Sequence, residues 1–341
     1  MVSQCNSASQ ATTREKQGRS CTLEMGPRKK PYVGHHEQCR IPSYIMADFG
    51  QTVHAFCNVQ TLLTNGIMLM SEDINVNDIS LMAIEREEYV IFKELLHMVP
   101  SLESCLMGSS EEMVTTVAEL IQKGINSARA DDTKGVKTTI IDWITPKGQS
   151  LNPHIPQNMK SGRGFNHEHT GALLCPAGLD WANIKTRTKL VNGQIQVAGD
   201  QWPIFLYANY TYDMEDPWNG LFSVDQEPKA TCSGNTQIHG MRSVTKASIV
   251  YIVTQTCFAL TSAQIFSQTD LVTDSECFYF SIVELLDDPD EKEEVDQLMT
   301  WWNRQIFPLY ADPECLPSRD SALARIHQKW MECRKRDTEY N

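Results

Sequence analysis

Two histidines and an arginine in the segment RGFNHEH are the side chains best placed to do chemistry. His167 and His169 are two residues apart, a spacing that puts both imidazoles on one face of a strand. With a carboxylate such as Asp180 or Asp200 they would form a facial iron site of two histidines and one carboxylate. No second spaced motif completes such a shell. We therefore interpret both imidazoles as bonded to backbone groups, and we assign no metal and no cofactor to the chain.

Cys175 follows the two histidines and is a candidate nucleophile. A thiol–imidazole pair requires spatial contact and a base that a third group orients. Sequence proximity supplies neither condition, and cysteine is among the most frequently buried residue types. We interpret Cys175 as a buried thiol.

Arg163 precedes a Gly-Phe turn and is the candidate ligand-binding residue of the segment. A planar, permanently charged guanidinium can hold several backbone carbonyls and a carboxylate together. We expect Arg163 to be at least half buried and paired with Glu168 or Asp180, fastening the turn between His167 and Cys175 to the rest of the domain.

Composition limits the possible partners. The chain has 341 residues, of which 41% are hydrophobic, and a net charge of −13. This charge argues against broad adhesion to nucleic acids or anionic membranes and makes a protein partner the expected one, ahead of a small molecule. Two short basic clusters, at 28–30 and 334–336, are typical of solvated terminal segments.

The cysteines and the N-terminus point to an intracellular location, cytoplasmic or nuclear. The 11 cysteines are scattered, with no CxxC pair. The N-terminus lacks the apolar core of a secretory signal, and no apolar run is long enough to span a bilayer. We expect a soluble protein with reduced thiols.

Periodicity predicts a mainly α protein of eight to ten helices. Residues 44–63 carry an apolar helical face, and residues 84–98 form a clearer helix. Capping residues and prolines bound the others. They are 111–123 ending at Gly124, a helix begun by Asp131 and Asp132, a turn capped by Thr170, 182–190 capped by Asp180, 246–260 capped by Thr245, 275–286, a helix opened by Asp288-Pro289, and 321–334.

An aromatic-rich segment, residues 160–218, lies between these helices. Its tryptophans have no other partners of matching size than Trp301 and Trp302, so we expect the segment to pack as irregular structure on helices 246–260 and 289–306. Residues 194–197 alternate in polarity and predict at most a minor β-hairpin with 204–207.

Composition also divides the chain. Residues 1–40 are polar, without periodicity, and are typical of a disordered tail. Residues 41–310 predict a single irregular multi-helix domain, and residues 311–341 a C-terminal helix and tail.

Five segments resemble an uncharacterised domain family that is found, often in many copies, in mushroom-forming (basidiomycete) fungi. They are RGFNHEHTGALLCPAGLDW, GDQWPIFLYANYTYDMEDPW, SGNTQIHGM, VTKASIVYIVTQTCFAL and EVDQLMTWWNRQIFP. The resemblance runs from Glu85 to Phe307 and implies a single intracellular domain. The family has no assigned activity, so it supplies no catalytic residues.

This copy departs from the family pattern. Arginine usually stands where the chain has Cys232, Cys257 and Cys277, and an Ala-Arg pair where it has Thr236-Gln237. A segment of roughly twenty residues that usually follows Phe222, about 30 Å long if helical, is missing. These differences predict a degenerate copy of a multiplied, cytosine-methylated gene, truncated internally, or a mis-spliced product of such a gene.

Two function classes follow. The preferred one is a non-enzymatic helical interaction protein, associated with chromatin or mobile elements. The alternative is an enzyme whose metal or acid–base site is built on Arg163, His167, His169 and Asp200. The chain lacks the phosphate-loop, Rossmann, GxSxG, HExxH, kinase and EF-hand signatures, which favours the first class.

Overall fold

The structure is a computed structural model that describes residues 41–71, 83–223, 243–266 and 275–307. Over these residues the protein is mainly α, as predicted, with ten α-helices and no strand. The predicted tails, the helix at 321–334 and positions 232, 236 and 237 lie outside the described residues. The helices are α1 (Ser43–Thr52), α2 (Val59–Ser71), α3 (Ala83–Met98), α4 (Leu102–Met107), α5 (Glu111–Ile144), α6 (Glu168–Leu174), α7 (Ile184–Val191), α9 (Lys246–Leu260), α10 (Ser275–Asp287) and α11 (Lys292–Ile306).

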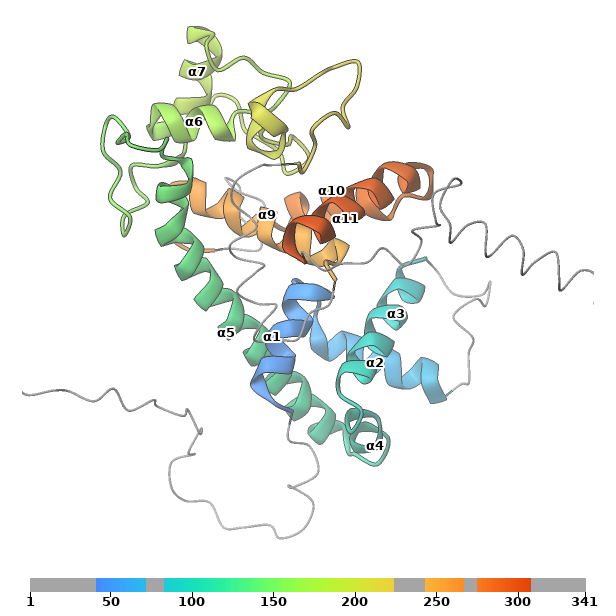
Figure 1. Ribbon diagram of the computed structural model, residues 1–341. Coiled ribbons are helices and arrows are strands. Elements are labelled where there is room, and N and C mark those ends of the chain that lie inside the picture. The colour runs from blue at the N-terminus through green and yellow to red at the C-terminus, as the bar shows by residue number, and fades with distance from the viewer. Residues whose placement is uncertain (1–40, 72–82, 224–242, 267–274, 308–341) are drawn as a thin grey trace, which may run out of the picture. The chain divides into compact units, whose positions relative to one another are not determined.

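Helix α5 is one uninterrupted helix of 34 residues (Figure 1). The prediction of two helices separated at Gly124 is wrong. A Cβ at Gly124 would lie 2.6 Å from the Cβ of Met46, so glycine allows α1 to approach α5 closely and does not end the helix. Asp132 does not begin a helix, because it lies inside α5. Its carboxylate instead accepts hydrogen bonds from Gln51 and from Tyr251 of α9. Tertiary contacts thus override the local end signals.

The two halves of α5 belong to two hydrophobic clusters. Its N-terminal half packs with α1 to α4 around Phe49, Leu63 and Phe92. Its C-terminal half packs with α9, α10, α11 and the central segment around Trp302 and other large side chains. Helix α5 therefore connects the two clusters.

The predicted helix over 44–63 is interrupted between α1 and α2. His54 Nδ1 accepts the backbone N–H of Phe56, and Asn58 Oδ1 accepts that of Thr61. Side chains that bond nearby backbone groups compete with the helical ladder. The apolar spacing is real, with Phe49, Val59 and Leu62 all buried, but it continues across a turn.

Residues 160–218 contact α9 and the start of α11, as expected, and they also contact α10, which was not predicted. Trp202 Nε1 donates to Ser281 Oγ (2.9 Å) in α10, and Trp218 Nε1 donates to Glu291 Oε2 (2.7 Å), in the 3₁₀ turn Pro289–Glu291 that leads into α11. No hairpin forms among the described residues, within the prediction of at most a minor one: 204–206 is a 3₁₀ turn, and only the isolated bridges Pro176–Pro203 and Tyr207–Leu221 are present there. No described helix is long and apolar enough to cross a membrane.

The start signals of the C-terminal helices are confirmed where they are described. Thr245 and Ser248 form a reciprocal capping box at the start of α9. Asp288 caps the 3₁₀ turn that begins with Pro289 and leads into α11. Two central caps are wrong: His167, not Thr170, caps α6, and Asn183, not Asp180, caps α7.

Candidate functional site

The segment RGFNHEH forms a 3₁₀ turn, Gly164–Asn166, followed at once by α6. His167 is the N-cap of α6, and its Nδ1 accepts the backbone N–H of His169 at 3.1 Å. Since Nδ1 accepts, Nε2 carries the hydrogen and donates to the carbonyl oxygen of Pro153 at 2.7 Å. Both nitrogens of this buried imidazole are therefore bonded to backbone.

His169 points to a different carbonyl. Its Nε2 lies 2.9 Å from the oxygen of Ile144, the last residue of α5. The strand geometry that a two-histidine metal site would need is not formed, because His167 is the N-cap of α6 and His169 lies in the first turn of that helix. Among the described residues no group of three or more His, Cys, Asp or Glu side chains is arranged to hold a metal ion.

Arg163 is fully buried, with 0% of its surface exposed. Its Nη1 donates to the carbonyl oxygen of Ala259 (2.8 Å), and its Nη2 donates to those of Lys137 and Gln157 (both 2.9 Å). The guanidinium thus connects the C-terminal end of α9, the C-terminal half of α5 and the loop between α5 and α6. Burial lowers its pKa from the usual arginine value.

The predicted burial of Arg163 is confirmed, but the predicted carboxylate partner is wrong. Glu168 is turned outward, where it accepts two hydrogen bonds from Arg187 (2.8 and 2.9 Å) and one from Trp181 Nε1 (3.0 Å). Asp180 accepts the backbone N–H of Ala182. Three carbonyl dipoles replace the expected negative charge.

Lys160 is a second buried cation, and no sequence signal marks it. Only 1% of its surface is exposed, and Nζ donates to the carbonyl oxygen of Phe258 at 2.6 Å. The ammonium also lies 3.2 Å from the centroid of the Phe258 ring. Burial, then the charges of Arg163 and Lys137, lower the pKa of Lys160 to about 7. Its partner is 98 residues away, a pairing that only the tertiary structure specifies.

We call Lys160, Arg163, His167 and His169 the carbonyl clamp. Its side chains donate to the oxygens of Phe258 and Ala259 in the last turn of α9, and to that of Ile144 at the end of α5. The last carbonyls of a helix lack intrahelical partners and carry partial negative charge, which cations and N–H donors stabilise. The clamp therefore satisfies two helix ends and joins them to the central segment.

Neither Cys175 nor Asp200 is hydrogen-bonded to the two imidazoles in the described structure. Cys175 is buried, its Sγ lies 3.6 Å from the oxygen of Leu179, and burial, then the charge of Asp180, raise its pKa to about 11. A thiol with this pKa is a poor source of the nucleophilic thiolate. Asp200 lies exposed in a surface turn.

The other described cysteines differ in redox state. Cys57 and Cys257 are free thiols, like Cys175, in agreement with the predicted reduced state. Cys105 is disulfide-bonded, so the prediction fails at that position.

Over its described residues, then, this is a helical protein in which buried cations and imidazoles hold the ends of two helices. A family model described as "Family of unknown function (DUF6698)" matches residues 123–307. The match covers more than half of the chain, so the chain belongs to this family. It includes the C-terminal part of α5, the carbonyl clamp, and α9 to α11. No curated protein and no solved structure matches the chain.

Proposed function

We propose that this chain is a non-enzymatic interaction protein. The observation that carries the proposal is the carbonyl clamp: the side chains that could have formed a catalytic centre are bonded to backbone carbonyls instead. A general base must reach the proton it abstracts. Both nitrogens of His167 and the Nε2 of His169 are already engaged, which supports a structural role for the segment.

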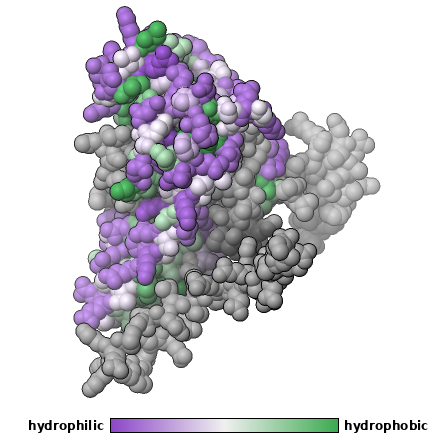
Figure 2. All heavy atoms as spheres, turned by 90° about the vertical axis from the view of Figure 1, so that its left-hand side faces the viewer, coloured by the Kyte–Doolittle hydropathy of each residue, from purple (hydrophilic) through white to green (hydrophobic). Residues whose placement is uncertain are grey.

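The partner we propose is a protein, with weak or no binding of nucleic acid. The net charge of −13 disfavours phosphate contacts. The described part of the face in Figure 2 is mostly hydrophilic, with hydrophobic residues scattered singly. A partner bound there would meet mainly polar groups, as at the rim of a non-obligate interface.

The finer assignments rest on the sequence. We propose an intracellular, chromatin- or mobile-element-associated protein with one domain over 41–310, from a multi-copy basidiomycete family. We also propose that this copy is degenerate. Genomic reads would overturn that idea if they carried the missing segment after Phe222 as an intact exon, together with arginine codons at positions 232, 257 and 277.

Metal analysis of the purified protein tests the central proposal. We expect no stoichiometric iron or zinc, and a lower midpoint of thermal unfolding for the double variant His167→Ala, His169→Ala. Stoichiometric metal that this double variant loses would support the enzyme alternative and overturn the proposal.

Proximity labelling in a fungal host, with and without nuclease treatment, tests the partner class. We expect a set of protein neighbours that survives nuclease. A set that disappears with nuclease would show that nucleic acid, not protein, recruits the chain.

A further inference from the structure

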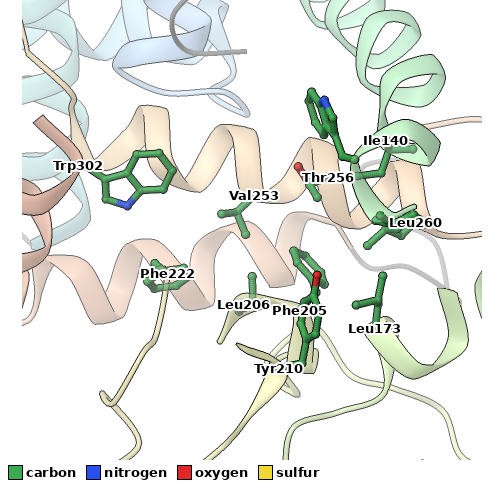
Figure 3. Close-up of a pocket in the computed structure, with 12 residues that line it drawn as sticks. Ile140, Leu173, Phe205, Leu206, Tyr210, Phe222, Val253, Thr256, Leu260 and Trp302 are labelled. Atoms are coloured by element: carbon green, nitrogen blue, oxygen red, sulfur yellow. The ribbon is translucent and has the colours of Figure 1, made fainter. Parts of the chain in front are cut away.

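An apolar cavity of about 40 Å³ lies between α5, α6, α9, α11 and the turns of the central segment (Figure 3). Its walls are mainly hydrocarbon and carry no charged side chain, but Thr256 and Tyr210 bring hydroxyl groups and Trp143 and Trp302 bring indole N–H groups. Ile140 and Leu260 line it from two helices, and Phe205 and Phe222 from the central segment. A charged molecule would lose its hydration here without compensation.

One wall carries a hydrogen-bond donor that has no acceptor. Trp302 is 1% exposed, lines the cavity, and its indole Nε1 has no hydrogen-bond partner in the described structure. Three other tryptophans differ: Trp181, Trp202 and Trp218 each donate to an oxygen, at 2.7–3.0 Å. Buried polar groups are nearly always bonded, so each unbonded one needs an explanation. The Nε of Arg163 is also unbonded, but it does not line this cavity.

Two aromatic residues of the cavity wall have an unusual backbone conformation. Tyr210 and Phe222 have φ values of +54° and +53°, in the left-handed region that bulky residues rarely adopt. Backbone hydrogen bonds fix both residues. The N–H of Tyr210 donates to the carbonyl oxygen of Tyr207, and the N–H of Phe222 donates to the carbonyl oxygen of Leu206 at 2.8 Å. Such conformations concentrate at ligand-binding sites. Tyr210 is also 50% exposed, so the cavity approaches the surface beside its ring.

We propose that this cavity binds the apolar end of a small neutral molecule through one acceptor oxygen, such as a ketone or ether oxygen, which accepts from Trp302 Nε1. The cavity exceeds the roughly 10–15 Å³ that one water occupies and is far below the roughly 300 Å³ of a drug-sized site. A resident water needs two to four polar partners. Besides Trp302 Nε1 the wall offers the hydroxyl groups of Thr256 and Tyr210 and the indole of Trp143, so the test has to separate a ligand oxygen from a water. The inference is independent of the proposed interaction function.

The indole N–H signals of the ¹⁵N-labelled full-length protein test the proposal, with the Trp302 signal assigned through Trp302→Phe. The probes are acetone and isobutene, which share a shape but differ in the acceptor oxygen and are smaller than any ring compound. We expect acetone to shift the Trp302 signal saturably and to bind at least fivefold more weakly to Trp302→Phe, the effect of losing one hydrogen bond. Isobutene should bind both proteins equally.

Two controls keep the test decisive. Trp301→Phe removes a neighbouring indole that does not line the cavity, and it should bind acetone like the wild type. Val253→Leu should weaken the binding of both probes, because the larger side chain fills the cavity. This variant replaces Trp302→Phe in the test if Trp302→Phe fails to fold. The proposal is overturned if the Trp302 signal does not shift, if both probes bind equally to wild type and Trp302→Phe, or if the free protein shows a water cross-peak at the Trp302 N–H.

Discussion

The guanidinium of Arg163 donates to the carbonyl oxygen of Ala259, 96 residues away in the last turn of α9, at 2.8 Å. The same group also holds carbonyls of Lys137 and Gln157. One side chain thus satisfies three carbonyls from three parts of the chain.

Arg163→Lys should therefore lower the free energy of unfolding by about 2–5 kcal/mol, because one ammonium cannot replace all three hydrogen bonds, and a buried carbonyl such as that of Ala259 or Gln157 costs about 1–3 kcal/mol when it is left unbonded. Urea denaturation measures the loss. The matched control is Arg187→Lys on the exposed Glu168 pair, with an expected change below about 1 kcal/mol. Equal effects of the two substitutions would contradict the role of the clamp.

Two glycines of α5 should respond in opposite directions to alanine. A Cβ at Gly135 meets nothing within 4 Å, so Gly135→Ala should stabilise the protein by about 0.5–1 kcal/mol through helix propensity. A Cβ at Gly124 would lie 2.6 Å from Met46 Cβ, so Gly124→Ala should destabilise by about 1–3 kcal/mol. Thermal unfolding of the two variants compares them. A stabilising Gly124→Ala would show that α1 and α5 do not need this close contact.

His54 should make the protein acid-sensitive. Burial lowers its pKa to about 4 from 6.5, so the unfolded chain binds the proton first as pH falls. The contribution of neutral His54 to the free energy of unfolding is therefore complete above pH 6.5 and is lost as the pH falls from 6.5 to 4. The loss is about 3 kcal/mol, because each unit of pKa shift corresponds to about 1.36 kcal/mol. His54→Asn keeps an acceptor for the Phe56 N–H and should flatten this part of the pH–stability curve. Parallel curves for the two proteins would refute the assignment.

Lys160 should make the free energy of unfolding depend on pH above pH 7. Its pKa of about 7 lies below the unfolded value of 10.5, so between these values the unfolded state binds more protons. Stability should therefore rise with pH from 7 to 9, by about 2 kcal/mol relative to Lys160→Met, which has no ammonium to titrate. Urea denaturation at pH 7, 8 and 9 gives the difference between the two proteins. A constant difference would mean that Lys160 keeps its proton in the folded state.

Cys257 and Cys277 distinguish a buried from an exposed position for arginine. Burial raises the pKa of the Cys257 thiol to about 12, while nearby Lys160 acts to lower it. Cys257→Arg should bring a third cation to the clamp and destabilise by about 3 kcal/mol or more, as expected for an unpaired buried charge. Cys277 is exposed, and Cys277→Arg should change stability by less than about 1 kcal/mol. A stable Cys257→Arg protein would support arginine as the ancestral residue there.

Local signals in the sequence determined much of the fold. The capping residues Thr245 and Asp288 and the apolar spacing of 84–98 predicted α9, the start of α11 and α3, because each depends on residues a few positions apart. The dense aromatic residues of 160–218 likewise predicted the packing of this segment on distant helices.

Tertiary structure decided the continuity of α5 and the role of RGFNHEH. Gly124 is a typical end signal unless a neighbouring helix lies against it, and that neighbour is not encoded locally. On a strand, His167 and His169 would lie on one face and could bind a metal ion together. At the start of α6 they bond two separate carbonyl oxygens instead. The sequence identified Arg163 as a clamp, but its partners are backbone carbonyls that only folding brings together. Because every residue has a carbonyl, residue types could not reveal which ones Arg163 binds.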